Sequence, residues 1–166
     1  TMIKFKNFGL LEILVSLSVA YVVAMLMWTA ITREDVLEKV NTIKLNHKNV
    51  VDLLNSEINK CTLSPEDKTS WGENCDLAWS SSLIVEYVLE NMELKNPYLI
   101  KKPLIQTSTD PRIQAEGKAG QSTDKGVIFV SATDFTPDAG SEWIIGTCVK
   151  SPCVAAGNNE LVSVYR

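Results

Sequence analysis

Residues 7–31 read NFGLLEILVSLSVAYVVAMLMWTAI, an apolar run that contains a single acid, Glu12. From residue 8 to residue 31 the run covers roughly 24 residues, enough for an α-helix to cross the hydrocarbon core of a bilayer, about 30 Å thick. The first proline of the chain is Pro65, so no proline interrupts a helix in this region. This stretch therefore predicts a long N-terminal helix with an apolar first half.

The pattern changes after residue 31. In residues 32–60 the apolar positions recur mostly at steps of three and four residues, which indicates a helix with one buried stripe. We expect the apolar and amphipathic segments to form one continuous helix of about 50 residues, called here the spine. The predicted stripe consists of Val36, Val40, Ile43, His47, Val50, Val51, Leu54 and Ile58.

Composition and motifs bear on the class of protein. The chain has 166 residues, with 16 Lys and Arg against 20 Asp and Glu, for a net charge of −4. This balance argues against general binding of polyanions. No glycine-rich phosphate loop and no nucleophile elbow occurs in the sequence. His47 lies on the apolar stripe, which favours a packed histidine over a catalytic base. The sequence predicts no enzyme activity, no catalytic residue and no cofactor.

Glu12 is the exceptional residue of the apolar run. A charged side chain within a membrane segment costs about 2.5–3.5 kcal/mol on insertion scales, and such residues are usually paired. The next basic residue along the chain is Arg33, about 30 Å away in a helix. A partner would come from another chain, or from a new α-amino group created by cleavage near Phe8. The alternative is a carboxylate that reaches the membrane interface or is kept neutral by burial.

The order of these features resembles the N-terminus of type IV pilins and pseudopilins. A short basic segment, residues 1–7 with Lys4 and Lys6, precedes the sequence FGLLE and the apolar helix. In that family a prepilin peptidase cuts after the basic leader, the new N-terminal residue is methylated, and an acid stands fifth. The resemblance implies cleavage between Asn7 and Phe8, which makes Glu12 fifth.

Two positions differ from the family pattern, and one further motif agrees with it. The family prefers Gly before the cut, where this chain has Asn7, and many pilins carry a helix-loosening Pro that this chain lacks. Residues 95–98, KNPY, are similar to a short motif that follows the second helix in some pilins, especially the type IVb group.

The resemblance implies a structural subunit of an extracellular type IV pilus-like filament. Its partners would be copies of itself in a helical homopolymer, assembled through residues 8–31. It would be anchored in the inner membrane before assembly, and would require a prepilin peptidase and the pilus assembly machinery. In such filaments Glu12 would meet the free amine of Phe8 in a neighbouring subunit and select the axial register. Adhesion, motility, DNA uptake and conjugation are roles of such filaments, and the sequence does not identify a surface or DNA ligand.

Two alternatives remain open at this point. One is a pseudopilin of a type II-like secretion system, which shares every N-terminal feature named above. The other is an uncleaved single-span membrane protein whose extracytoplasmic domain binds a ligand or a surface.

Residues 61–166 are expected to form a globular headgroup, which gives an α+β fold. A second helix is predicted after Asp76 as N-cap, with a face of Leu77, Ile84, Val88 and Met92 and an end at Pro97. Residues 126–135, 141–149 and 160–166 are rich in β-branched and aromatic residues, which predicts an antiparallel sheet of three or four strands. Residues 106–125 are polar and are expected to form an exposed loop.

The four cysteines all follow the apolar segment. An even number in an exported domain favours disulfides, and three pairings are possible. Cys61–Cys75 with Cys148–Cys153 is preferred because each bond closes a local polar loop. A zinc site is the alternative, but the spacings between these cysteines suit it poorly.

Two other groups of residues have alternative interpretations. Asp134, Asp138 and Glu142 cluster near an expected turn; they indicate a solvated hairpin or, alternatively, a calcium site like that of major pseudopilins. Three tryptophans are expected to anchor the core or an interface: Trp71, Trp79 and Trp143. No metal ligand is predicted.

Overall fold

The structure is a computed structural model that describes residues 9–98, 103–116, 125–133 and 140–166. The chain divides into two compact units, one ending at Glu38 and the other comprising Lys39–Arg166. Helix α1, Leu10–Leu63, contributes to both units and is one continuous α-helix of 54 residues. The continuous spine predicted from the sequence is therefore present, without a break between its apolar and amphipathic segments.

The C-terminal unit, Lys39–Arg166, is built on the apolar stripe of α1. Ile43, Val50 and Leu54 are completely buried, and Ile58 is nearly so. The first two predicted stripe positions, Val36 and Val40, are half-buried. Each buried stripe side chain contributes roughly 1.5–3 kcal/mol relative to exposure, so this face of α1 anchors the fold of the unit.

Four strands form one sheet in the order β1-β2-β3-β4. They are β1 Ile105–Thr107, β2 Ile128–Ala132, β3 Glu142–Cys148 and β4 Asn159–Tyr165. The last three pair antiparallel, as the sequence predicted, but β1 pairs parallel with β2. The expectation of a wholly antiparallel sheet was thus wrong for β1. A parallel neighbour requires a crossover connection, and the segment between β1 and β2 supplies one that contains helix α3, Pro111–Glu116.

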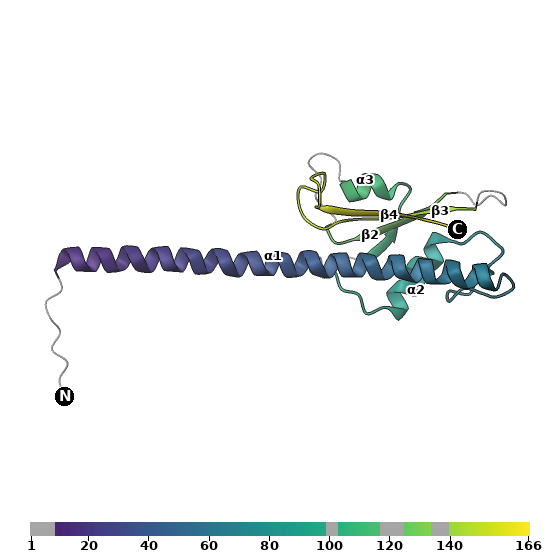
Figure 1. The fold of residues 1–166 in the computed structure, drawn as a ribbon, viewed down its shortest axis with the longest axis horizontal. Helices are drawn as coiled ribbons and strands as arrows, with labels where there is room; N and C mark the ends of the chain where they lie inside the picture. Colours follow the sequence, from purple (N-terminus) through teal and green to yellow (C-terminus); the bar gives the residue numbers. More distant parts are fainter. Residues whose placement is uncertain (1–8, 99–102, 117–124, 134–139) are drawn as a thin grey trace, which may run out of the picture. The chain divides into compact units, whose positions relative to one another are not determined.

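Both faces of this sheet are covered (Figure 1). Alternate residues of β2 and β3, including Val130, Trp143 and Ile145, belong to the same buried cluster as α1 and helix α2, Ser81–Asn91. The opposite face carries α3, which lies above the strands in Figure 1. At Gly146 a Cβ atom would come within 2.7 Å of the Pro111 carbonyl oxygen, so a glycine allows the close approach of α3 to β3.

Helix α2 begins later and ends earlier than predicted. Asp76 was expected as the N-cap, but Ser80 occupies that position and Leu77 is exposed. The reason is that residues 75–80 make hydrogen bonds to other parts of the chain. The backbone N–H of Ser80 donates to the Glu73 carboxylate, and the Arg166 guanidinium donates to the carbonyls of Cys75 and Leu77. Ile84 and Val88 of the expected apolar face are buried.

The sequence prediction missed β1 and α3, which lie at the start of the polar stretch expected to be a loop. The Asp110 carboxylate accepts a hydrogen bond of 3.0 Å from the Arg112 N–H at the start of α3, and Pro111 is its first residue. A side-chain cap followed by proline is a recognised start of a helix, so the dipeptide Asp110-Pro111 could have predicted α3. Ile105 is fully buried in β1.

His47 is packed in the core, as predicted. Its side chain is buried between α1 and the sheet, and its Nε2–H donates to the Ile145 carbonyl at 3.1 Å. Burial lowers the pKa of the His47 imidazole below its usual value near 6.5, although the Ile145 carbonyl and the Glu160 carboxylate act in the opposite direction. The neutral ring is therefore favoured in the folded chain.

We predict a loss of stability on mild acidification that depends on His47. Above pH 6.5 the ring is neutral in both states; below it, the unfolded chain binds a proton that the folded chain resists, so the free energy of unfolding falls by up to about 1.4 kcal/mol per pH unit. His47→Gln keeps an amide donor near the same position and should flatten this dependence. Urea unfolding of the full chain in detergent between pH 5.5 and 7.5 measures it. Equal slopes for both proteins would contradict the prediction.

Candidate assembly helix and disulfide-bonded loop

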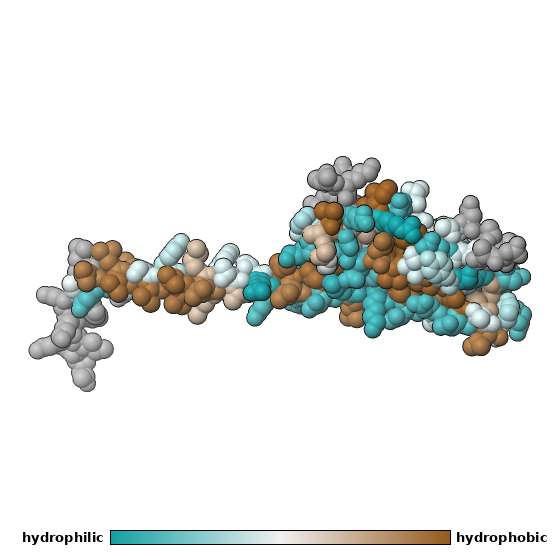
Figure 2. Space-filling model, turned by 45° about the horizontal axis from the view of Figure 1, so that its top comes forward, coloured by the Kyte–Doolittle hydropathy of each residue, from teal (hydrophilic) through white to brown (hydrophobic). Residues whose placement is uncertain are grey.

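The first unit exposes an apolar helix surface. Every residue from Leu11 to Ile31 is exposed within the described chain. By length and composition this helix can cross a membrane. Figure 2 shows apolar side chains along this part of α1, and few polar ones. Contact with water is unfavourable for such a surface, and burial in an apolar environment is favourable.

Glu12 lies in the first turn of α1, where its side chain is close to the end of the helix. Its Oε2 atom accepts a hydrogen bond of 3.2 Å from the Gly9 N–H. A carboxylate at this position satisfies a backbone donor that lacks a partner within the helix, and it interacts favourably with the positive end of the helix dipole. Asn7 and Phe8, the predicted processing site, lie outside the described residues.

The cysteines form Cys61–Cys75 and Cys148–Cys153, the pairs favoured by the sequence. The first bond joins the last turn of α1 to the following loop, and the second closes the start of the β3–β4 connection. All four cysteines are buried. With every cysteine engaged, none is free to bind zinc.

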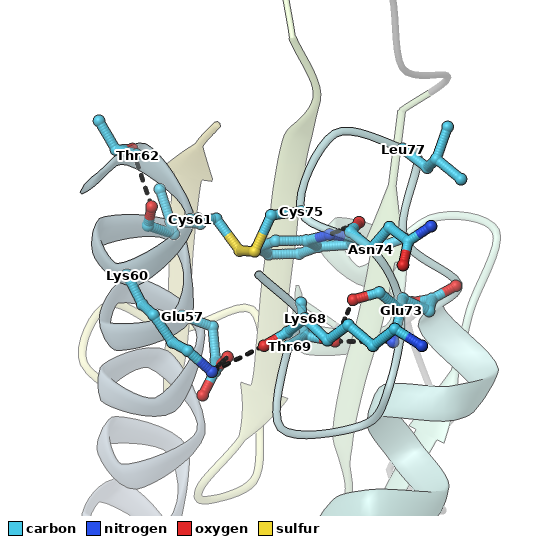
Figure 3. The surroundings of a disulfide bond; sticks show 12 residues. Glu57, Lys60, Cys61, Thr62, Lys68, Thr69, Glu73, Asn74, Cys75 and Leu77 are labelled. Carbon is cyan, nitrogen blue, oxygen red and sulfur yellow. Dashed lines mark hydrogen bonds and ion pairs between the residues drawn. A yellow bond between two sulfur atoms is a disulfide. The ribbon is translucent and has the colours of Figure 1, made fainter. Parts of the chain in front are cut away.

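The loop closed by Cys61–Cys75 is also attached to α1 through charged side chains (Figure 3). Glu57 is buried, and its carboxylate accepts hydrogen bonds from the backbone N–H and the hydroxyl of Ser70. Lys60 Nζ lies 3.9 Å from the Glu57 carboxylate and donates to the Lys68 carbonyl at 2.7 Å. A buried carboxylate without such donors would be costly, so Glu57 fixes the loop in this position. The sequence pattern did not identify Glu57.

The same loop contacts the start of α2 and the end of the chain. The Glu73 carboxylate accepts from the Trp71 indole N–H at 2.9 Å and from the Ser80 N–H at 2.9 Å. The Arg166 guanidinium lies 4.0 Å from the centre of the Trp79 ring and donates to the Leu77 carbonyl at 2.7 Å. These contacts join three distant segments, which is a structural role rather than a chemical one.

The predicted tryptophan anchors lie together in this region. The ring centres of Trp71 and Trp79 are 5.2 Å apart, and those of Trp79 and Trp143 are 6.3 Å apart. Trp79 and Trp143 are buried, and Trp71 is partly buried against the core cluster. The aromatic groups therefore pack the C-terminal unit internally.

For the alternative calcium site, the structure describes only one of the three expected ligands. Asp134 and Asp138 lie outside the described residues. The Glu142 carboxylate contacts Arg112 Nη2 at 3.1 Å and the Tyr165 hydroxyl at 3.2 Å. Hydrogen bonds from Ser163 and Tyr165, together with Arg112, lower the pKa of Glu142. Within the described ranges, no group of three or more potential ligands could hold a metal ion.

A cleft of about 360 Å³ lies between the start of α2 and the sheet. The walls are mostly hydroxyl-bearing, with an edge of Trp79, and the lining residues include no carboxylate and no imidazole. Such a surface can exchange hydrogen bonds with a polar molecule. The hydroxyl groups come from Ser80, Ser81, Ser108, Ser131, Thr133 and Ser141.

Comparisons of the chain with protein-family models, with curated proteins and with solved structures find no match. Three features of the molecule itself bear on its function: an exposed apolar helix, an acid in its first turn, and a disulfide-bonded α+β unit built on its second half.

We predict that the two disulfides differ in their contribution to stability. The paired cysteines are 14 residues apart in the first bond and 5 in the second. In the chain-entropy account, closing these loops is worth about 3 and about 2 kcal/mol respectively. Urea unfolding should therefore show a larger loss for the double variant Cys61→Ala, Cys75→Ala than for the matched double variant Cys148→Ala, Cys153→Ala. The opposite order would show that the longer loop does not need its covalent closure.

Proposed function

We propose that this protein is the structural subunit of a type IV pilus-like filament, assembled through its N-terminal apolar helix. The observation that supports the proposal most strongly is the position of Glu12. It is an acid in the first turn of a helix whose residues are exposed from Leu11 to Ile31. In a helix that only anchors a domain in lipid, an acid there serves as a local cap for the helix end, whereas an assembling helix can also pair it with a charge on a neighbouring chain.

Burial of this helix among identical helices supplies the attraction. At about 25 cal/mol per Å² of apolar surface, removing roughly 1,000 Å² from water contributes on the order of 25 kcal/mol before the entropy costs of association. Hydrophobic contact is not directional, so this term alone does not determine how far one helix slides along the next.

Glu12 supplies the missing selectivity. After cleavage between Asn7 and Phe8, each chain carries an α-amino group at Phe8, and the Glu12 of a neighbour is its natural counter-ion. A mispaired subunit leaves a charge buried without a partner, at a cost of about 3–5 kcal/mol. The pair therefore acts against wrong registers more than it adds to stability.

The filament proposal also implies a cellular location for the protein. The apolar helix holds the chain in the inner membrane before assembly, and the C-terminal unit faces an oxidising compartment, consistent with two disulfides in its folded structure. In the assembled filament the C-terminal units form the extracellular surface. The proposal includes no enzyme activity.

A second candidate is an uncleaved membrane-anchored binding protein, favoured by the hydroxyl-lined cleft between α2 and the sheet. The mass of the N-terminal peptide of the native protein separates the two. A chain that begins at a methylated Phe8 supports the filament subunit, and the pseudopilin alternative with it. A chain that retains residues 1–7 supports the anchored binding protein.

We predict that Glu12→Ala reduces or abolishes filaments while the chain still accumulates in the membrane, because the helix remains apolar but loses its register selection. Electron microscopy and membrane fractionation of cells that make only the variant would measure both effects. Ser16→Ala is the matched control, since Ser16 lies one turn later and its hydroxyl only donates to the Glu12 carbonyl at 2.8 Å. Filaments at the normal level with Glu12→Ala would refute the register role.

We also predict that a chain starting at Arg33 is soluble and folded and forms no filaments. It retains the whole C-terminal unit, Lys39–Arg166, with its core and both disulfides. It lacks the exposed apolar surface, so sedimentation at micromolar concentration should show only small soluble species. If this shortened chain formed the same filaments as the full chain, assembly would not depend on the apolar helix.

A further inference from the structure

Strand β4 forms an open edge of the sheet. It pairs with β3 on one side only, and no other strand follows it in the sheet order. Ser141 and Arg166 exchange two backbone hydrogen bonds, of 3.1 Å and 3.0 Å, just beyond the ends of the two strands. Because such pairs alternate along an antiparallel ladder, the even-numbered residues of β4 bond to β3 and the odd-numbered ones point their N–H and C=O groups outward.

These outward groups have no partner in the part of the chain that the structure describes. No backbone hydrogen bond from Leu161, Ser163 or Tyr165 to another element is present among the described residues. Open edges in natural proteins are commonly blocked by Lys, Pro or a bulge. The sequence from Asn159 to Tyr165 contains neither Lys nor Pro, and its pairing with β3 runs without a bulge. Leu161 and Tyr165 are exposed on this strand, by 39% and 70%.

The side chains of β4 match those of a second copy of β4 that runs in the opposite direction. Residues 160–166 read ELVSVYR, with Ser163 at the centre. If a second copy pairs antiparallel about Ser163, Leu161 meets Tyr165 and Val162 meets Val164, each twice. Glu160 is placed opposite Arg166, also twice. Leu161 and Tyr165 lie in outward-bonding positions, so this register uses the open hydrogen-bonding groups. A shift of two residues would instead place Leu161 opposite Ser163, and a shift of four would place it opposite Leu161; either shift would separate Glu160 from Arg166.

We propose that the β4 edge is an interface for a second copy of this chain, paired antiparallel about Ser163 to form a continuous eight-stranded sheet. Each apolar pair, Leu161 with Tyr165, is of the aromatic–aliphatic kind that stabilises neighbouring strands. Glu160 contacts Lys44 at 2.6 Å, and Arg166 binds carbonyls near the Cys61–Cys75 loop. Glu160 and Arg166 face each other in this register, where opposite charges attract and like charges would repel.

The pairing is symmetric, so it closes after two copies and does not continue into a fibre. It requires only residues of the C-terminal unit and does not depend on the proposed filament. A partner of unrelated sequence would not reproduce the double match of charge and side-chain type, which is why a second copy is the occupant favoured by the strand.

Cysteine cross-linking of the full chain in detergent tests both the pairing and its register. Opposite residues in a hydrogen-bonded pair have Cα atoms about 5.5 Å apart, within reach of a disulfide. Ser163→Cys should therefore form a cross-linked dimer by itself under mild oxidation. Leu161→Cys alone and Tyr165→Cys alone should not, because each lies about 13 Å from its own copy at roughly 3.3 Å per residue. Mixing these last two proteins should restore the dimer.

The comparison among these variants contains its own controls. All three substitutions are on one strand with exposed side chains, so random collision would not favour Ser163→Cys or the mixture over the other samples. We expect at least a tenfold excess of dimer for Ser163→Cys, and for the mixture, over either single variant alone. Equal cross-linking of all samples, or a dimer of Leu161→Cys alone at the level of Ser163→Cys, would overturn the proposal.

A second variant tests the hydrogen bonds directly. Ser163→Pro removes an outward N–H, which β3 does not use, so the sheet should remain folded. Introduced together with Leu161→Cys and with Tyr165→Cys, it should abolish cross-linking of the mixture, whereas Ser163→Ala, which retains the N–H, should leave it intact. Circular dichroism of each protein checks the fold. Undiminished cross-linking in the folded proline variant would show that the edge does not pair.

Discussion

The burial of one stripe of α1 against the sheet is the contact on which the C-terminal unit depends. Ile43, Val50 and Leu54 are completely buried there, and the core residues of α2 and of the central strands belong to the same region of the molecule. Residues 39–63 supply these buried side chains, so the second half of the helix is part of the core. The first half has no such contact, and its apolar residues remain available to other molecules.

Polar groups then determine how the other segments attach to this core. Glu57 and Asn46 are buried on α1 among apolar neighbours, and each fastens a separate segment: Glu57 binds the disulfide-bonded loop, and Asn46 donates to the Lys95 carbonyl at 3.0 Å. Hydrogen bonds of this kind add modestly to stability, but an unsatisfied buried group is costly. Their main effect is therefore to exclude other arrangements of the loops.

The sequence predicted the elements whose signal is local. The long helix and its buried stripe follow from hydrophobic spacing, because a period of three to four residues specifies which face is buried. Strands β2 to β4 follow from runs of β-branched and aromatic residues. The start of α2 could not be predicted in this way, since it depends on Arg166, which is distant in sequence. β1 was missed because three residues in a polar stretch give no period, and its parallel pairing depends on the crossover through α3. Glu12 was identified because it is the single acid in the apolar run, whereas Glu57 is one acid among several in the charged second half of the helix.

The direction of β4 relative to α1 limits which molecules can meet through this edge. Glu160, near the start of β4, contacts Lys44 of α1, and Arg166 after its end binds near Cys75, which is bonded to Cys61. Strand and helix thus run the same way through the C-terminal unit. In the proposed antiparallel pair, residues 39–63 of the two copies of α1 run in opposite directions. Copies of the same polarity are not able to pair in this way, so the proposed interface is open only to copies of opposite polarity.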